Sequence, residues 1–192
     1  MNSNKVLVAG IGLICFVVIA FSQGDAKHFA KDGLGFDYAS GWTIADTSNA
    51  DAQQLTLTRH NSDSQIVVFA HRGKVETPEK FASAKKAFID PYVKSMNDRF
   101  VQMGATAQSS PAKSQIGGLP AEGVRLRASL GGEGAETSIF WLTLDNRIVM
   151  LTLFAPDTEL KQVTPAWDTV RNTIKIEPPP AKTSPSPTPK KP

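Results

Sequence analysis

The stretch that most constrains the fold runs from Leu119 to Ile176, and its centre is a β-hairpin. Two largely apolar runs, Thr137–Leu144 and Arg147–Phe154, are separated only by Asp145-Asn146. Aspartate and asparagine tolerate the positive φ that a two-residue hairpin turn requires. The sequence therefore predicts a tight hairpin whose register is set by its turn.

Both faces of this hairpin are rich in apolar side chains. The turn predicts the cross-strand pairs Phe140–Leu151 and Leu142–Val149 on one face, and Trp141–Met150, Ile139–Thr152 and Thr143–Ile148 on the other. Such a sheet must be covered on each side. We expect an α+β fold with an antiparallel sheet of about six strands and helices on both faces, an α/β/α sandwich. Phe140 and Trp141 are then core residues, and neither is a ligand platform.

Two helical segments are available as covers, Pro78–Met103 and about Thr158–Ile174. Thr77 is suited to cap the first, with Pro78 in its first turn. Pro91 interrupts this segment, so a kink or two helical pieces are expected. Both segments carry one apolar stripe, which in the first comprises Phe81, Ala84, Phe88, Tyr92, Met96, Phe100 and Met103.

The other strands are short or polar. They are Leu34–Tyr38, Trp42–Ala45, a hairpin of Gln53–His60 with Gln65–Arg72, the run Gly123–Leu130, and Ala105–Ile116 as an edge strand or loop. A four-residue loop in the first hairpin would pair Leu57 with Val68 and Leu55 with Ala70, and would set His71 opposite Gln54. Pro111 is compatible with an edge strand only.

The ends of the chain differ in composition from its centre. Residues 1–22 carry Lys5 and the uncharged run Val6–Phe21, which is short for a bilayer span of ~20 residues but suits a secretory signal. Cleavage before Gln23 is expected; retention of residues 6–21 as a membrane anchor is the alternative. We expect a polar lead-in at 23–32, a domain at 33–176, and a Pro/Lys-rich disordered tail at 177–192. The protein is then exported, periplasmic or extracellular, or anchored to the inner membrane.

Cysteine and charge exclude several functions. The only cysteine, Cys15, lies in the signal, and Ile14 before it does not fit a lipoprotein site. A mature chain without cysteine excludes thiol catalysis and disulfides. The formal net charge is +3, but Lys5 contributes +1 and residues 178–192 contribute +3, which leaves the region between them at −1. A near-neutral domain carries no electrostatic footprint for nucleic acid.

No motif in the sequence specifies a catalytic, cofactor or metal site. His28, His60 and His71 lack metal-ligand spacing, and Gly131–Gly134 fits no phosphate loop. We therefore predict a non-enzymatic protein without a cofactor. An unrecognised hydrolase would require the fold to gather one polar cluster from Arg125, Arg127, Glu133, Glu136 and His71.

Three groups of residues admit a binding role beside a structural one. Arg125 and Arg127 share a strand face that could bind an anion, or could be exposed or covered by helical carboxylates. The tail lysines could touch peptidoglycan or anionic lipid, or simply be solvated; they are Lys182, Lys190 and Lys191. Four aromatic side chains could line an apolar cleft or pack in the core; they are Phe81, Phe88, Tyr92 and Phe100.

The segment Gly35–Trp42 resembles the opening of PsbP-like domains, a short strand and turn before Gly-Trp, which DcrB-type exported bacterial proteins share. Gly118-Leu119-Pro120-Ala121, the following strand, the aromatic hairpin and the last helix keep the order of that superfamily. Ala39 and Ser40 stand where a proline often precedes the turn. The resemblance spans roughly Gly33–Ile176 and implies an antiparallel sheet between helices, without catalytic residues.

Three hypotheses of function follow. PsbP-like proteins are mostly assembly or accessory factors, so the resemblance favours an exported cell-envelope module that binds a protein partner. The alternative is a carrier or sensor of a small apolar or lipid ligand held between helix and sheet. The third is the hydrolase.

Overall fold

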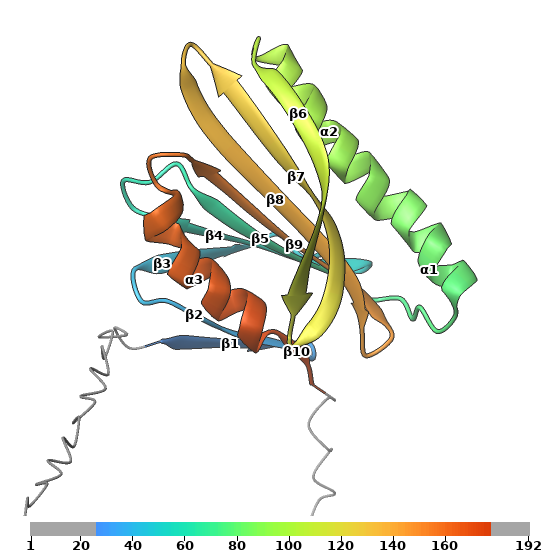
Figure 1. Cartoon of the computed structure of the whole chain (residues 1–192). Coiled ribbons are helices and arrows are strands. Elements are labelled where there is room, and N and C mark those ends of the chain that lie inside the picture. The colour runs from blue at the N-terminus through green and yellow to red at the C-terminus, as the bar shows by residue number, and fades with distance from the viewer. Residues whose placement is uncertain (1–25, 178–192) are drawn as a thin grey trace, which may run out of the picture.

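The hairpin lies inside a seven-stranded antiparallel sheet in the computed structural model, which describes residues 26–177 (Figure 1). In spatial order the strands are β3 (Trp42–Asp46), β4 (Ala52–Arg59), β5 (Gln65–His71), β9 (Arg147–Pro156), β8 (Glu133–Leu144), β7 (Leu119–Leu130) and β6 (Thr106–Ile116). The expected α+β class is confirmed, with seven strands in the main sheet rather than about six. The polar stretch ending at Ile116 is an edge strand, and the strand after it begins at Leu119 rather than Gly123.

A second, three-stranded sheet consists of β1 (Lys27–Lys31), β2 (Leu34–Tyr38) and β10 (Lys175–Ile176). β1 falls within the predicted polar lead-in at 23–32, so the folded region begins upstream of residue 33. The turn at Ala39–Gly41 leads from the small sheet into β3 of the main sheet. The predictions for residues 1–22 and for the tail beyond 177 lie outside the described residues.

The central hairpin has the predicted register. Phe140 is opposite Leu151, and Trp141 is opposite Met150. Asp145 and Asn146 adopt φ of 46° and 58°, as the two-residue turn requires.

The register predicted for the β4–β5 hairpin is wrong by two residues. Leu57 lies opposite Ile66 and Leu55 opposite Val68, while His71 is opposite Ala52 rather than Gln54. Pairing ends earlier than expected, at Thr58 and Gln65, so the loop has six residues rather than four, and its Ser62 and Ser64 donate to the Glu159 carboxylate. A shift of two residues keeps every side chain on its predicted face.

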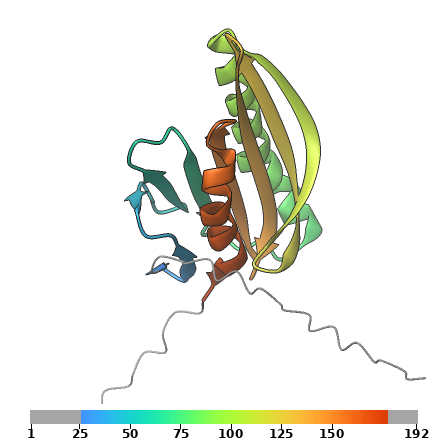
Figure 2. The same cartoon turned by 60° about the vertical axis from the view of Figure 1, so that its left-hand side comes forward.

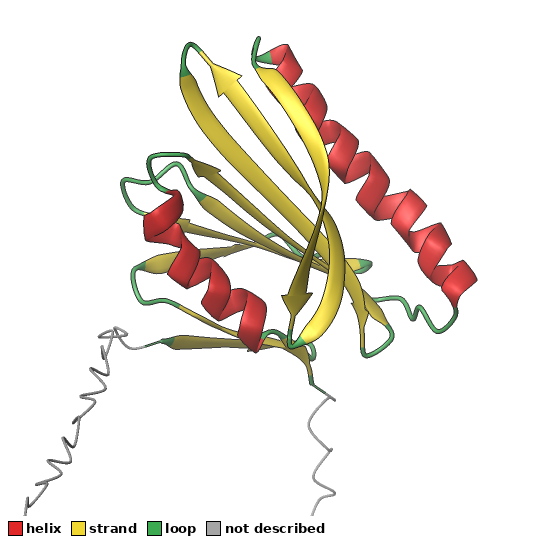
Figure 3. Ribbon diagram, in the orientation of Figure 1, coloured by secondary structure: helices red, strands yellow, loops and turns green. Residues whose placement is uncertain are grey.

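Helices cover both faces of the main sheet, as predicted (Figure 3). The segment predicted at Pro78–Met103 forms three pieces in succession: α1 (Pro78–Ala84), the π-helix η1 (Lys85–Ile89) and α2 (Asp90–Gln102). Their apolar residues pack on Ile139, Trp141 and Met150. On the opposite face, α3 (Leu160–Thr173) packs on Phe140 and Leu151. Phe140 and Trp141 are both buried, as expected for core residues.

The helix α3 covers only part of its face. The long strands β6, β7 and β8 extend past its N-terminal end, where α2 still runs along the other face (Figures 1 and 2). Within residues 26–177, no helix has both the length and the hydrophobicity needed to cross a membrane.

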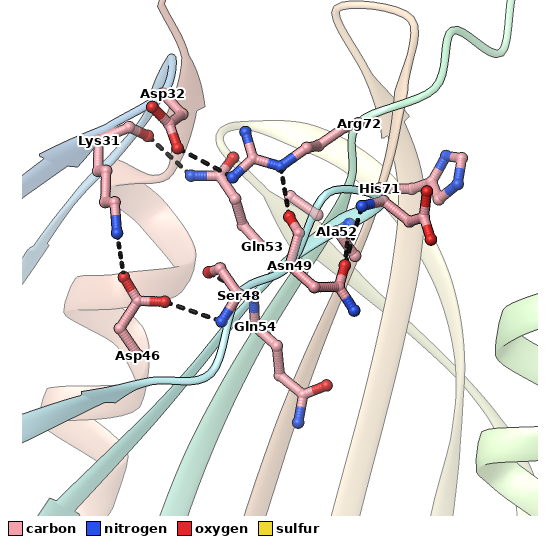
Figure 4. A network of polar contacts seen from close by, with 12 residues as sticks. Lys31, Asp32, Asp46, Ser48, Asn49, Ala52, Gln53, Gln54, His71 and Arg72 are labelled. Atoms are coloured by element: carbon pink, nitrogen blue, oxygen red, sulfur yellow. Dashed lines mark hydrogen bonds and ion pairs between the residues drawn. The ribbon is translucent and has the colours of Figure 1, made fainter.

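Polar contacts attach the small sheet to the main one (Figure 4). Lys31 pairs with Asp46 at 2.6 Å, and Arg72 pairs with Asp32 at 2.9 Å. The buried Gln53 donates from Nε2 to the Lys31 carbonyl at 2.7 Å and accepts from Arg147 at 2.6 Å. The turn between β1 and β2 is therefore held in place by Asp46 of β3, by Gln53 of β4 and by Arg72, which directly follows β5.

Candidate binding groove

A groove of about 740 Å³ lies between the helical layer and the edge of the sheet formed by β6 and β7. Its helical wall consists of Lys85, Asp90, Val93, Lys94 and Asn97. Its floor comprises Ser109, Pro111, Ala112, Lys113, Glu122, Gly123, Val124, Leu126 and Trp141. We refer to this space as the α2–β7 groove.

The floor of the groove follows from strand alternation. Side chains two residues apart on a strand point to the same face, so Glu122, Val124 and Leu126 all face α2. Trp141 on β8 lies next to them, because it pairs with Glu122. The apolar surface is therefore a regular strip along β7, bordered by the polar side chains of the edge strand.

A second hollow of about 420 Å³ extends the α2–β7 groove toward the turn between β6 and β7. The two hollows share Glu122 and Trp141, and the second is also lined by Phe81, Leu119, Pro120, Leu142 and Thr143. From Pro120 to Leu126 the strip measures ~20 Å at 3.3 Å per residue.

Lys85 and Trp141 meet at the junction of the two hollows. The Lys85 ammonium lies 5.4 Å from the centroid of the Trp141 ring, within cation–π range, and pairs with Asp90 at 2.5 Å. Trp141 is only 6% exposed, and its indole Nε1 is buried without a hydrogen-bond partner in the described part of the chain. Lys85 is the first residue of η1, and single π-turns within α-helices frequently occur at functional sites.

The two helical layers are attached to the sheet by different kinds of contact. Arg171 of α3 donates to Ser114 Oγ at 2.7 Å and to the Gln115 carbonyl at 3.2 Å. Thr173 Oγ1 accepts from Asp37 N at 2.8 Å. Glu159, at the start of α3, accepts from Ser62 and Ser64, and these bonds lower the pKa of its carboxyl group. The helix α3 is therefore fixed along its length by polar contacts as well as by its core.

Within residues 26–177, no ion pair joins Pro78–Gln102 to the main sheet, and the approach of the Tyr92 hydroxyl to Thr152 is the one polar contact between them. Its hydrogen-bonded lysines are Lys80, Lys85 and Lys94, and they pair with carboxylates of the same segment or with Glu76, two residues before it. The Tyr92 hydroxyl approaches Thr152, whose Oγ1 has no hydrogen-bond partner there, and burial raises the pKa of Tyr92. Apolar packing and the Lys85–Trp141 contact hold this layer in place.

Three of the four aromatic residues predicted to line a cleft or pack in the core do the latter. The ring of Phe88 lies 6.0 Å from Phe69 and 4.5 Å from His71, and Phe100 lies 6.3 Å from Phe154. Tyr92 packs in the same cluster. Only Phe81 borders the groove. The other lining residues gave no signal of their own, because the width of the groove depends on how the helix sits over the sheet.

Arg125 and Arg127 lie on the α3 face, beyond the end of the helix. Arg125 pairs with Glu136 at 3.0 Å, while Arg127 pairs with Glu136 at 3.1 Å and with Asp157 at 2.9 Å. Their carboxylate partners thus come from β8 and from the residue after β9, and not from a helix. Both arginines are already neutralised, and both remain about half exposed, at 49%.

The polar cluster required for a hydrolase does not form. Glu136 lies with the arginines, but the Arg147 guanidinium donates to the His71 carbonyl at 2.9 Å, near the other end of the sheet. Arg147 is opposite Leu144, eight residues along β8 from Glu136, or ~26 Å. Glu133 is exposed at the start of β8.

The histidines are likewise dispersed. His28 pairs with Asp37 at 2.6 Å, His60 is exposed after β4, and His71 Nδ1 accepts from Gly73 N at 3.0 Å. No group of three or more His, Cys, Asp or Glu side chains within residues 26–177 is arranged to hold a metal ion.

Comparison with known proteins identifies a shared fold. No protein-family model matches the chain, and no curated protein does. The solution structure of the cyanobacterial PsbP protein CyanoP from Synechocystis matches with a TM-score of 0.51 at 15% identity, covering 89% of this chain and 98% of that one. A crystal structure from Bacteroides thetaiotaomicron also gives 0.51 at 15% identity, over 81% of this chain and 49% of that one.

At lower similarity lies LpqN, a protein involved in cell envelope biogenesis of Mycobacterium tuberculosis. Its TM-score is 0.41 at 14% identity, over 80% of this chain and 90% of LpqN. At these identities, the two matches with a TM-score of 0.51 support a PsbP-like fold and nothing more specific. The closer resemblance to DcrB-type proteins stays a prediction.

Proposed function

We propose that this chain is a non-enzymatic, exported cell-envelope protein that binds an extended segment of a partner protein in the α2–β7 groove. The observation that carries the proposal is the groove itself, an apolar strip along β7 beside a helical layer that rests almost entirely on apolar packing. A wall held by apolar contacts can shift to admit a ligand without breaking a buried hydrogen bond.

The shape of the groove favours a polypeptide. The groove is open along one side, so one side of an occupant stays in water. An extended peptide suits this setting, since alternate side chains point down and up with the same period as Glu122, Val124 and Leu126. Small-molecule sites, by comparison, bury most of the ligand surface.

The edge strand itself is poorly suited to pairing with an added strand. In an edge strand, the nitrogen of a proline faces solvent, so Pro111 removes a backbone donor midway along β6. Lys113 places an exposed charge two residues further on, another feature that discourages edge pairing. We therefore expect recognition by side chains in the groove rather than by extension of the sheet.

The remaining parts of the proposal rest on the sequence and on the dispersed polar residues. The uncharged run at 6–21 supports export or anchoring. The separation of His71 from Glu136 supports a non-enzymatic role. The near-neutral folded region supports a protein partner over nucleic acid.

A second candidate function is transport or sensing of a small apolar or lipid ligand. It is favoured by the position of the groove between helix and sheet, with Trp141, Val124 and Leu126 in its lining. Native mass spectrometry of the purified full chain would then detect a co-purified molecule of lipid mass. A chain that purifies empty, and remains empty after incubation with palmitate, would remove this candidate.

Selection of random heptapeptides displayed on phage against the full chain tests the peptide proposal. We expect enriched peptides with apolar residues at alternate positions. Val124→Arg, which places a charge on the floor, should weaken their binding at least tenfold. Val101→Arg is the matched control, because Val101 is 58% exposed on α2 and does not line the groove. Peptides that bind wild type and Val124→Arg equally would overturn the proposed site.

A further inference from the structure

The Trp141 indole N–H is a buried donor beside the apolar side chains of Val124 and Leu126, in a strip whose other polar residue is Glu122. Buried indole N–H groups normally find an acceptor, yet Trp141 Nε1 has none within residues 26–177. Trp141 sits where the two hollows join, so a molecule that follows the strip must pass it. A bound molecule with a hydrogen-bond acceptor would satisfy this donor.

Lys85 currently occupies the space over the Trp141 ring. Its ammonium lies 5.4 Å from the ring centroid, and its side chain lines the larger hollow. Its partner Asp90 belongs to the same helical layer, so Lys85 is not bonded to the sheet. A rotation of this one side chain would expose the aromatic surface while leaving the core unchanged.

The charges around the groove restrict the occupant further. Three lysines and two carboxylates line the larger hollow. Lys85 and Lys94 pair with Asp90 and Asp98, whereas Lys113 lies opposite Glu122 in the β6–β7 register but has no carboxylate within 4.0 Å in the described region. An acidic side chain beside an apolar anchor would complement Lys113, and also Lys85 once it has moved off the ring.

We propose that Trp141 is the anchor point of the α2–β7 groove and that Lys85 is its gate. The inference rests on the proposed function. The occupant is an extended peptide segment with an apolar residue followed by an acidic one. The apolar side chain displaces Lys85 from the indole ring, a backbone carbonyl accepts from Nε1, and the acidic side chain pairs with the released lysine or with Lys113. Trp141 is then a specificity-determining residue rather than a filler of the core.

The test uses two capped peptides, acetyl-Leu-Val-Leu-Asp-amide and acetyl-Leu-Val-Leu-Lys-amide, with ¹⁵N-labelled full chain. The chain has three tryptophans, and the indole cross-peak that disappears in Trp141→Phe belongs to Trp141. We expect the aspartyl peptide to shift this peak downfield, because an N–H that gains an acceptor is deshielded. The lysyl peptide should bind about fivefold more weakly at low salt.

Three variants separate the steps. Trp141→Phe keeps the apolar ring but lacks the donor, and should bind the aspartyl peptide about fivefold more weakly, the value of one ordinary hydrogen bond. Lys85→Met removes the ammonium group from the face of the Trp141 ring. This variant should bind the uncharged control peptide, acetyl-Leu-Val-Leu-amide, about threefold more tightly, because a cation–π contact no longer competes with the peptide for the ring. Lys86→Met is the matched control, because Lys86 is exposed and does not line the groove, so no change is expected.

The outcomes distinguish this inference from the proposed function. If the peptides shift the Val124 and Leu126 methyl signals but leave the Trp141 indole peak unchanged, and Trp141→Phe binds as wild type, the anchor and gate are wrong while the groove remains the binding site. If the peptides leave all these signals unchanged, or shift only residues outside the groove, both proposals fail. A Lys86→Met effect equal to that of Lys85→Met would overturn the gate by itself.

Discussion

The two faces of the sheet are covered by helices of similar apolar character, but they are held in different ways. On the α3 face, Glu159, Arg171 and Thr173 all form hydrogen bonds to residues outside the helix. On the α1–η1–α2 face, the approach of the Tyr92 hydroxyl to Thr152 is the one polar contact with the sheet among the described residues. Buried polar groups without a partner occur on both faces, at Thr137, Trp141 and Thr152 on this one and at Arg171 Nε on the other. One face is therefore attached by several polar contacts, whereas the other rests almost entirely on apolar packing beside an open groove. The difference suggests that stability and binding are divided between the two sides of one sheet.

The largest expected effect is on the fixed face. Trp167 of α3 is 6% exposed and lies 6.4 Å from the Phe140 ring. Trp167→Ala should lower the free energy of unfolding by about 3–5 kcal/mol, because it leaves a large cavity in a core with polar attachments that resist collapse. Urea denaturation followed by circular dichroism measures the loss. A loss below about 1 kcal/mol would show that this face adjusts as easily as the other.

Glu159→Gln tests the polar attachment at the start of α3. It should cost about 1.5 kcal/mol at pH 7, because the carboxylate accepts two hydroxyl hydrogen bonds. These bonds lower the pKa of Glu159 in the folded state below its unfolded value of about 4.3. The stabilisation is therefore present above that value and is lost as the pH falls through the lowered folded pKa.

The corresponding measurement is urea denaturation of wild type and Glu159→Gln at pH 7 and at successively lower pH below about 4. The other acidic groups contribute equally to both proteins, so their difference isolates Glu159. It should be largest at pH 7 and should shrink as the carboxylate is protonated. A constant difference across this range would contradict the assignment.

Two threonine substitutions, one on each face of the sheet, should change the stability of the protein in opposite directions. Thr137 is fully buried on the face of Ile139 and Trp141, and its hydroxyl has no partner in the described region. Thr137→Val should stabilise the protein by about 0.5–1 kcal/mol, because it removes an unsatisfied polar group without changing volume greatly. Thr173→Val should destabilise it by about 1 kcal/mol, because the Thr173 hydroxyl accepts from Asp37 N at 2.8 Å and donates to the Thr169 carbonyl at 2.7 Å. Thermal denaturation of the two variants beside wild type measures both changes. Two changes in the same direction would contradict the comparison.

The smallest expected effect is that of Lys85→Met on stability. The Lys85–Asp90 pair is partly exposed, and its contact with Trp141 contributes about 0.5 kcal/mol. A chemical denaturation curve should place the variant within about 0.5 kcal/mol of wild type. A loss above 2 kcal/mol would mean that Lys85 is a structural tie rather than a gate.

The sequence was informative where the physical constraint is local. Asp145-Asn146 predicts the register of the central hairpin, and the apolar pattern on both of its faces predicts the two helical layers. The β4–β5 register was missed because the loop is two residues longer than the predicted four, and its Ser62 and Ser64 bond to Glu159, nearly a hundred residues away, a contact that no local pattern shows. The strand at Lys27–Lys31 was missed although its signal is local, since it pairs with the next strand across the two-residue turn Asp32-Gly33, where both residues have positive φ.

The groove could not be predicted from the sequence, for a different reason. Trp141 was assigned to the core, and it is buried, but its second role depends on the distance between the helical layer and the sheet. Phe88 and Phe100, for which the sequence allowed either a cleft or the core, pack in the core against Phe69 and Phe154. Periodicity identifies which side chains face inward, but it does not identify where two packed layers leave a space.

Native-state hydrogen exchange measured residue by residue on the full chain tests the central claim most directly. If almost only apolar contacts hold the α1–η1–α2 layer, the amides of Val93–Phe100 should exchange through an opening that costs at least about 2 kcal/mol less than the opening of Val163–Val170 in α3. Both stretches are helical, so intrahelical hydrogen bonding does not explain such a difference. Equal opening free energies for the two helices would contradict the account.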